Sequence, residues 1–126
     1  MKTKNYKITF SLSSGYSGTG ETFTPEFAEG IIEEWMAERI KNNLPTLNGF
    51  ITFGKLVFSA KDRREDGKLV TLVESGIYEG NLTSENDIKR KNSEIRDSLI
   101  SLATKLKDQL GQDRVYIIYE NECWFV

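Results

Sequence analysis

Histidine is absent from the 126 residues of this sequence. Histidine is the commonest general base and the commonest metal ligand near neutral pH, so its absence removes the usual means of activating a nucleophile. The sequence therefore excludes Ser-His and Cys-His catalytic pairs, and any zinc site that contains histidine. We expect neither a metal centre nor a bound cofactor.

Disulfide-forming cysteines, long apolar runs and an excess of positive charge are also missing. Cys123 is the only cysteine, which rules out a disulfide within the chain and is typical of a reducing compartment. No apolar run approaches the roughly 18–20 residues of a membrane span, and the first ten residues, MKTKNYKITF, lack a signal-peptide core. A net charge of −2 argues against a general nucleic-acid binder. We predict a cytoplasmic protein with no membrane partner.

The residue pattern predicts a single α+β domain spanning residues 1–126. Alternating apolar and polar residues indicate half-buried strands, and apolar residues at spacings of three, four and seven indicate helices. The predicted elements, in order, are a strand over 6–12, a helix from Thr24 to Leu44, strands over 50–60 and 68–74, one long helix from Ser84 to Leu110, and a strand over 115–119. This β-α-β-β-α-β order is typical of a ferredoxin-like sandwich, an antiparallel sheet with both helices on one face.

A sheet covered on one face leaves its other face bare. We expect apolar residues such as Val57, Leu69 or Val73 on that face, depending on the register, and a monomer rarely exposes so large an apolar patch. The sequence therefore predicts a homo-oligomer. Five aromatic residues are assigned to the core: Phe27, Trp35, Phe50, Phe53 and Phe58.

A segment rich in glycine and serine, SSGYSGTGET at residues 13–22, lies between the first strand and the first helix. Glycines let a backbone approach a ligand, hydroxyls donate hydrogen bonds, and a helix N-terminus attracts phosphate. However, the segment matches neither a Walker loop nor a dinucleotide fingerprint, and its composition is also typical of a flexible connection. Both interpretations stay open. In the first, the ligand-binding residues are Ser14, Gly15, Tyr16, Ser17, Gly18, Thr19 and Gly20.

Arginines and a second tyrosine extend this predicted ligand site. Arg63 and Arg64 lie between the two middle strands, and Arg90 lies in the early turns of the long helix. A guanidinium group can bind phosphate with two parallel hydrogen bonds, and Tyr78, placed between two glycines, could stack on a base. Acidic residues interleave with both basic clusters, so an ordinary solvated surface is the alternative.

Carboxylates are the remaining candidates for chemistry. Glu74 and Glu79 flank the predicted loop after the third strand, and Glu21 lies in the segment rich in glycine and serine. Their spacing fixes no pair of the kind that glycosidases use. Cys123 has no recognisable activating partner. We therefore predict a protein without catalytic activity.

The turn GQDRVYI at residues 111–117 ends the predicted long helix and leads into the last strand. This pattern resembles one shared by small bacterial and phage α+β proteins. As a class, the small, acidic, histidine-poor chain is also similar to phage antagonists of bacterial immunity, some of which are sponges for cyclic nucleotides or cyclic ADP-ribose. The resemblance implies a non-catalytic protein that sequesters a small phosphorylated, nucleotide-like ligand in the host cytoplasm. The alternative is an anti-defence or immunity protein that inhibits a protein partner by covering its surface.

Overall fold

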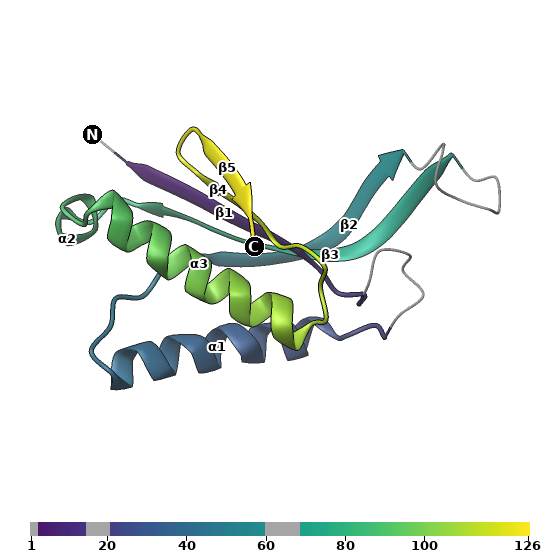
Figure 1. The fold of residues 1–126 in the computed structure, drawn as a ribbon, viewed down its shortest axis with the longest axis horizontal. Coiled ribbons are helices and arrows are strands. Elements are labelled where there is room, and N and C mark those ends of the chain that lie inside the picture. Colours follow the sequence, from purple (N-terminus) through teal and green to yellow (C-terminus); the bar gives the residue numbers. More distant parts are fainter. Residues whose placement is uncertain (1–2, 15–20, 60–68) are drawn as a thin grey trace.

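The computed structural model describes residues 3–14, 21–59 and 69–126, which form one sheet with helices on one of its faces (Figure 1). The elements are β1 (Lys4–Ser11), α1 (Pro25–Lys41), β2 (Phe50–Ser59), β3 (Val70–Leu82), α2 (Glu85–Ile88), α3 (Asn92–Gln109), β4 (Tyr116–Tyr119) and β5 (Glu122–Phe125). The strands follow the order β2-β3-β1-β4-β5, and all neighbours are antiparallel. The predicted α+β class and antiparallel sheet are therefore confirmed.

The sheet contains one strand more than the sequence predicts. The aromatic C-terminal tail forms β5, which pairs with β4 from Tyr116↔Phe125 to Tyr119↔Glu122. Glu120, with a φ of 53°, lies in the tight turn that joins the two strands. Residues 123–126, Cys-Trp-Phe-Val, form a continuous apolar run without alternation, so periodicity does not identify this strand. With β5 and the short helix α2, the structure departs from the predicted four-stranded pattern with two helices.

The prediction of one long second helix is wrong, because the chain forms α2, a break and then α3. The predicted N-terminal cap does form: the Asp87 backbone N–H donates to Ser84 Oγ at 3.1 Å, and Ser84 Oγ donates to Asp87 Oδ2 at 2.8 Å. No apolar residue lies between Ile88 and Ile95, so this turn has no apolar stripe to hold it on the sheet. α3 ends before Gly111, whose φ of 60° is typical of a helix C-terminus. The long helix used to support the protein-partner alternative is thus not formed.

β3 is longer than predicted, because it continues through two glycines that resemble turn signals in the sequence. A Cβ atom added to Gly76 would lie 2.5 Å from Cζ of Phe10. A Cβ atom added to Gly80 would lie 2.8 Å from the hydroxyl oxygen of Tyr6. Aromatic rings of β1 therefore require these glycines inside a strand, where glycine often marks a close approach.

The core lies between the sheet and the helices α1 and α3. Trp35 is buried and Phe53 packs against the core, as predicted, whereas Phe27, Phe50 and Phe58 are exposed. Phe50 and Phe58 are exposed because they alternate with Ile51 and Phe53 and so belong to the opposite face of β2. The largest fully buried side chains are Phe10, Ile8, Leu47, Leu82, Ile95, Leu99, Leu102, Leu106, Leu110 and Ile117. In the part of the chain described, no helix has the length and apolar character of a membrane span.

Candidate functional site

The uncovered face of the sheet, which points away from α1 and α3, carries a row of side chains from four strands. Tyr6 and Ile8 of β1 are buried toward the helices, so Lys7 between them points to the uncovered face. Lys7 lies directly opposite Glu79 of β3 on one side and Ile118 of β4 on the other. Phe50 of β2 lies opposite Glu79. Directly paired residues have Cβ atoms about 4.5–5.5 Å apart, so this row brings a carboxylate, an ammonium group and an aromatic ring close together.

The row lies in a cavity of about 820 Å³. A second row borders it, in which Asn5 of β1 is paired with Asn81 of β3. The Asn5 backbone N–H donates to Glu120 Oε1 at 2.8 Å, and the Glu120 backbone N–H donates to the Asn5 carbonyl at 2.9 Å. The lining residues are Asn5, Tyr6, Lys7, Asn48, Gly49, Phe50, Glu79, Gly80, Asn81, Thr83, Ile118 and Glu120.

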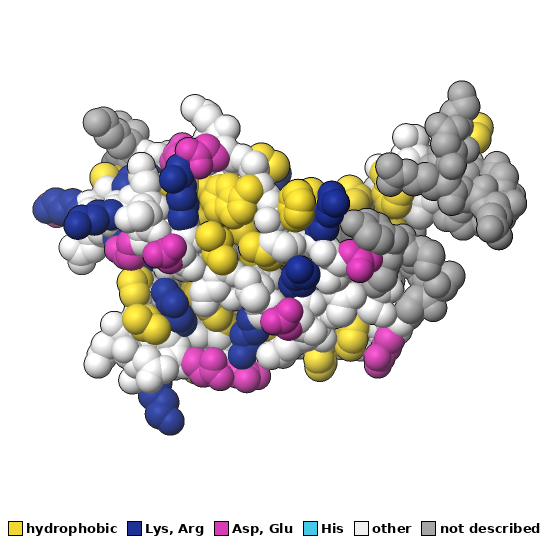
Figure 2. Space-filling model, in the orientation of Figure 1, with side chains coloured by type: hydrophobic (Ala, Val, Ile, Leu, Met, Phe, Trp, Pro, Cys, Tyr) yellow, Lys and Arg dark blue, Asp and Glu magenta, His cyan; other side chains and the backbone are white. Residues whose placement is uncertain are grey.

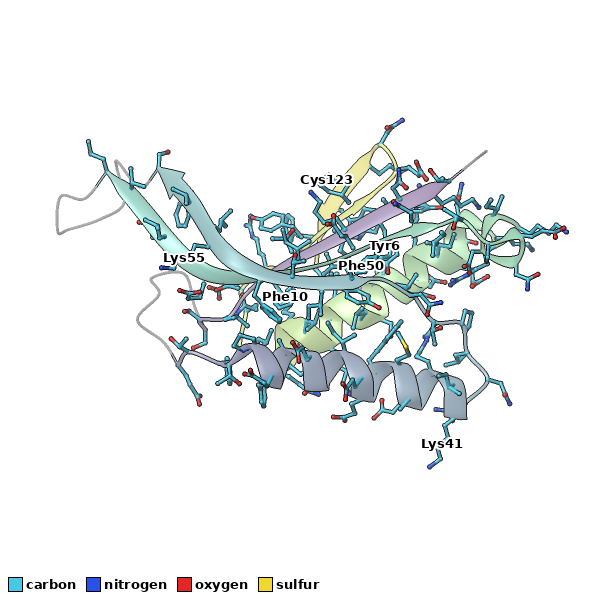
Figure 3. All side chains as sticks on the ribbon, turned by 180° about the vertical axis from the view of Figure 1, so that it is seen from behind. Tyr6, Phe10, Lys41, Phe50, Lys55 and Cys123 are labelled. Atoms are coloured by element: carbon cyan, nitrogen blue, oxygen red, sulfur yellow. The ribbon has the colours of Figure 1, made fainter. Side chains whose placement is uncertain are left out.

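Two buried tyrosines, Tyr6 and Tyr78, hold residues 47–49 at the rim of this cavity; Figure 3 labels Tyr6 and the cavity residue Phe50. The Tyr6 hydroxyl donates to the Asn48 carbonyl at 2.6 Å, and the Tyr78 hydroxyl donates to the Leu47 carbonyl at 2.5 Å. A Cβ atom on Gly49 would lie 2.5 Å from the Tyr6 hydroxyl oxygen, so this position requires glycine. Burial raises the pKa of both tyrosines, which keeps them protonated as donors at neutral pH. The rim is therefore fixed from beneath by the core.

The cavity is weakly negative. Its charged lining residues are Glu79, Glu120 and Lys7, which give two negative charges and one positive charge, and so a formal charge of −1. A second cavity, of about 190 Å³, lies further along the same face. It is lined by Thr9, Thr52, Phe53, Gly54, Lys55, Leu56, Ser75 and Ile77. In the described ranges, no group of three or more acidic or cysteine side chains could hold a metal ion.

The predicted site rich in glycine and serine is described only at its two ends. Ser13 and Thr22 form an antiparallel bridge, and the Ser14 backbone N–H donates to the Glu21 carbonyl at 2.9 Å. Ser14 lines neither of the two cavities. The other predicted ligand contacts of this segment, residues 15–20, lie outside the described residues, as do Arg63 and Arg64.

The other two predicted ligand contacts, Tyr78 and Arg90, are engaged within the protein. Tyr78 is only 4% exposed, so its ring offers no free face for stacking. Arg90 donates from Nε to Glu94 Oε1 at 2.7 Å, from Nη1 to the Thr46 carbonyl at 2.7 Å, and from Nη2 to Ser98 Oγ at 3.3 Å. These bonds tie the segment before β2 to α3. We therefore place neither residue in the candidate site.

Sequence reasoning recognises Glu79 as a candidate carboxylate but misses the residues around it. Lys7 appears there only as the polar partner in an alternating strand, and Phe50 is assigned to the core. The alternation of β1 does place Lys7 on the face opposite to Tyr6. The missing information is the register, because only strand pairing sets Lys7 beside Glu79.

No protein-family model and no curated protein matches this chain. Two solved structures are similar to it in fold. One is a phage SAM lyase in complex with S-methyl-5′-thioadenosine, with a TM-score of 0.66 and 13% sequence identity; the match covers 98% of this chain and 88% of that chain. The other is a phage SAM lyase in its apo state, with a TM-score of 0.65 and 12% identity, covering 98% and 87% of the two chains.

These likenesses contradict two expectations from the sequence. Both neighbours are lyases, and therefore enzymes, so they contradict the prediction of a non-catalytic protein. They equally oppose the sponge and its alternative, a protein that acts by covering a partner's surface. The prediction fails because it relied on the absence of histidine, whereas lyases can act without a Ser-His or Cys-His pair. The expectation of a small ligand agrees with the nucleoside bound by one neighbour. The expectation that this ligand is a cyclic nucleotide has no support.

Proposed function

We propose that this protein is a lyase that cleaves S-adenosylmethionine (SAM), and that SAM binds in the 820 Å³ cavity of the uncovered face. The main support is a fold likeness over 98% of the chain to a SAM lyase that binds S-methyl-5′-thioadenosine. That nucleoside is what remains of SAM when its four-carbon amino-acid portion leaves the sulfur atom. A fold can host several activities, so the argument also needs a site that suits this substrate.

The cavity suits SAM in size and in charge. Its volume of about 820 Å³ lies within the range of roughly 300–1,000 Å³ that small-molecule sites occupy. At neutral pH SAM carries a sulfonium, an ammonium and a carboxylate group, and so a net charge of +1. The formal charge of the cavity is −1. Opposite charges favour the encounter of the two and suppress binding of anionic nucleotides.

Each part of SAM can be matched to a lining residue. The Phe50 side chain is 79% exposed, which leaves an aromatic face free for stacking on adenine. The amide groups of Asn5 and Asn81 can donate to and accept from the nucleoside. Glu79 provides a negative charge for the sulfonium, and Lys7, its direct neighbour across the strands, provides a positive charge for the carboxylate.

The proposed reaction breaks the bond between sulfur and the four-carbon chain. As that bond breaks, a carboxylate oxygen of the same SAM molecule bonds to the released carbon, so the four-carbon portion leaves as a lactone that keeps its ammonium group. The bonding electron pair stays on sulfur, which becomes the neutral thioether of S-methyl-5′-thioadenosine, and neither water nor a proton acceptor is required. The positive charge on sulfur disappears during this step. A carboxylate close to the sulfonium therefore stabilises the bound substrate more than the transition state, so we assign Glu79 a role in binding rather than in bond cleavage.

The test is direct incubation of the full chain with SAM, with product analysis by liquid chromatography and mass spectrometry. We expect S-methyl-5′-thioadenosine to accumulate in proportion to enzyme and time, and far less of it with the double variant Glu79→Gln/Phe50→Ala. Heat-denatured protein corrects for the slow spontaneous breakdown of SAM. Intact SAM together with no heat of binding in calorimetry would refute the proposal.

Several finer predictions are retained here as proposals. β3 lies between β1 and β2, as in a split βαβ unit, which supports the ferredoxin-like assignment with β5 as an addition. The two phage proteins of similar fold support a phage origin, and hence action in the host cytoplasm. We also retain the predicted homo-oligomer.

A further inference from the structure

The segment that leads from α1 into β2 forms the rim of the large cavity and is held by side chains. We call residues 45–49 the rim segment, because Asn48 and Gly49 line the cavity and Phe50 follows them directly. Each of its first four carbonyl groups accepts a hydrogen bond from a side chain of another part of the fold. The four bonds are Arg39 Nε to Pro45 at 2.8 Å, Arg90 Nη1 to Thr46 at 2.7 Å, the Tyr78 hydroxyl to Leu47 at 2.5 Å, and the Tyr6 hydroxyl to Asn48 at 2.6 Å. Among the described residues, no backbone N–H group donates to these four carbonyls, so side chains fix their position.

Arg90 lies in the break between α2 and α3, where its own contacts hold it in place. Its side chain is only 11% exposed and donates from Nε to Glu94 Oε1 at 2.7 Å. Asp87 Oδ1 lies 3.5 Å from Nη1, so two carboxylates balance the buried charge. The Arg90 carbonyl accepts from Lys4 Nζ at 2.6 Å. Over α1 and α3, Figure 2 shows Lys and Arg side chains interspersed with Asp and Glu side chains, so this surface offers no large basic patch to a phosphate.

Ser98 of α3 connects Arg90 with Arg39. Its side chain is fully buried, and its Oγ accepts from Arg39 Nη2 at 3.0 Å and from Arg90 Nη2 at 3.3 Å. The same hydroxyl donates to the Glu94 carbonyl at 3.1 Å. A serine hydroxyl has one donor and two acceptor positions, so all three are used here. Ser98 therefore fixes the two guanidinium groups relative to each other, and each of them uses another nitrogen for the rim segment.

The rim segment determines where the proposed adenine-stacking residue lies. Phe50 is the first residue of β2, the edge strand of the sheet, and its exposed side chain has little packing of its own. Its position therefore depends on the residues that precede it. A site that is ordered before the ligand arrives binds more tightly, because the cost of ordering is not charged against the affinity.

We propose that Arg39 and Arg90, linked by Ser98, are positioning residues of the large cavity. They hold the rim segment in its ligand-binding conformation without touching the ligand, since neither arginine lines the cavity. The inference rests on the proposed function for the identity of the ligand, SAM. The order of the rim segment can be measured without any ligand.

The first experiment measures backbone ¹⁵N order parameters of the full chain by NMR. Values of about 0.85 are typical of rigid backbone and values below about 0.6 of flexible backbone. We expect residues 46–49 to be rigid in the wild type, although they belong to no helix or strand. Arg90→Gln should make them flexible and leave residues 95–106 of α3 unchanged. A flexible rim segment in the wild type, or a rigid one in this variant, would overturn the proposal.

Arg96→Gln is the matched control for this experiment. It removes the same charge from a neighbouring position of α3, where Arg96 forms an ion pair with Glu122 and does not contact the rim segment. We expect residues 46–49 to stay rigid in this control. Loss of order there would show that any loss of charge on α3 loosens the rim, which contradicts a specific role of Arg90.

The second readout separates positioning from a general loss of stability. Arg90→Gln should raise KM for SAM about tenfold, because the rim segment must then be ordered on binding, and should leave kcat nearly unchanged. A variant that only destabilises the fold reduces the amount of active enzyme, and so lowers the apparent kcat at unchanged KM. That second pattern contradicts the proposal.

Arg39→Gln keeps the test decisive if Arg90→Gln fails to fold. It removes the bonds to Pro45 and Ser98 and should also loosen residues 46–49 and raise KM. In the double variant the two increases in KM should be less than additive in free energy, because both arginines act on one rim segment. Full additivity contradicts the link through Ser98. If the wild type binds no SAM, the proposed function fails, whereas the order parameters still decide the role of the arginines.

Discussion

The replacement Glu79→Gln tests the proposed site most sharply, because it removes one charge and keeps the shape of the side chain. If Glu79 lies beside the sulfonium of bound SAM, the variant should raise KM and leave kcat nearly unchanged. The reason is the loss of charge on sulfur during cleavage: the interaction exists in the bound substrate and fades in the transition state. An unchanged or slightly higher kcat is therefore part of the expected result.

The expected size of the KM increase follows from the solvent exposure of Glu79. Two unit charges 4 Å apart interact by about 1 kcal/mol in water and by about 4 kcal/mol near a partly shielded protein surface. Glu79 is exposed, and Lys7 lies directly beside it, so the lower figure applies. About 1 kcal/mol corresponds to roughly a fivefold increase in KM, since tenfold corresponds to about 1.4 kcal/mol. High salt should reduce the difference between the wild type and the variant.

The assay is the initial rate of S-methyl-5′-thioadenosine release over a range of SAM concentrations. Glu33→Gln is the matched control, because it makes the same charge change on an exposed residue of α1, on the other side of the sheet. We expect this control to keep both constants. A hundredfold loss of kcat at unchanged KM would refute the binding role of Glu79, and unchanged constants would show that SAM binds elsewhere.

Three more outcomes are expected. Phe50→Ala should raise KM for SAM by about 5- to 150-fold, the equivalent of about 1–3 kcal/mol of stacking, whereas Phe27→Ala, which removes an exposed ring of α1, should leave KM unchanged in the same assay. In urea titrations, Gly80→Ala should lower the free energy of unfolding by about 1–3 kcal/mol, because the added Cβ atom has no room. Gly30→Ala, where an added Cβ atom meets nothing within 4 Å, should raise the free energy of unfolding by about 0.5–1 kcal/mol. Burial raises the pKa of Tyr6 above its ordinary value of 10.0. Above about pH 10 the unfolded chain therefore releases the Tyr6 hydroxyl proton, whereas the native state keeps it. The free energy of unfolding should be unaffected by this group below about pH 10 and should fall above it by up to about 1.4 kcal/mol per pH unit. In urea titrations at several pH values, Tyr6→Phe should show a smaller fall.

The local signals in the sequence predict the fold best where a short-range interaction fixes the backbone. Thr24 caps α1 by accepting a hydrogen bond from the Phe27 backbone N–H at 3.1 Å, and Gly111 ends α3 with a positive φ. Both depend on neighbouring residues alone. The length of β3 cannot be predicted in that way, because Gly76 and Gly80 serve aromatic rings of β1 that are distant in sequence. The residues next to these glycines in the sequence therefore indicate a turn, whereas the packed structure shows that each glycine makes room for an aromatic ring.

The site is harder to predict from sequence, because pairing between distant strands creates it. The segment over residues 13–22 contains recognisable ligand-binding types, yet its described ends bond to each other, to Ser11 and to Gln112, and Ser14 lines neither cavity. The cavity instead gathers ordinary residues: Lys7 from β1, Glu79 from β3 and Phe50 from β2. Each is separated from the others by more than 25 residues. Arg90 shows the converse, because its guanidinium group has the chemistry of a phosphate ligand but its hydrogen bonds connect parts of the fold.

The two faces of β1 explain how a chain without histidine could carry the proposed substrate site. Tyr6 and Ile8 point into the core, so burial fixes β1 against α3, and the Tyr6 hydroxyl holds the cavity rim through the Asn48 carbonyl. Lys7 and Asn5 alternate with them and therefore point into the cavity, on a strand that the core has made rigid. A shift of the β1 register by one residue would exchange these two sets of side chains. The hydrophobic core thus fixes the geometry of the charged row, and the sulfonium chemistry proposed for it needs fixed charges more than a proton-transfer residue.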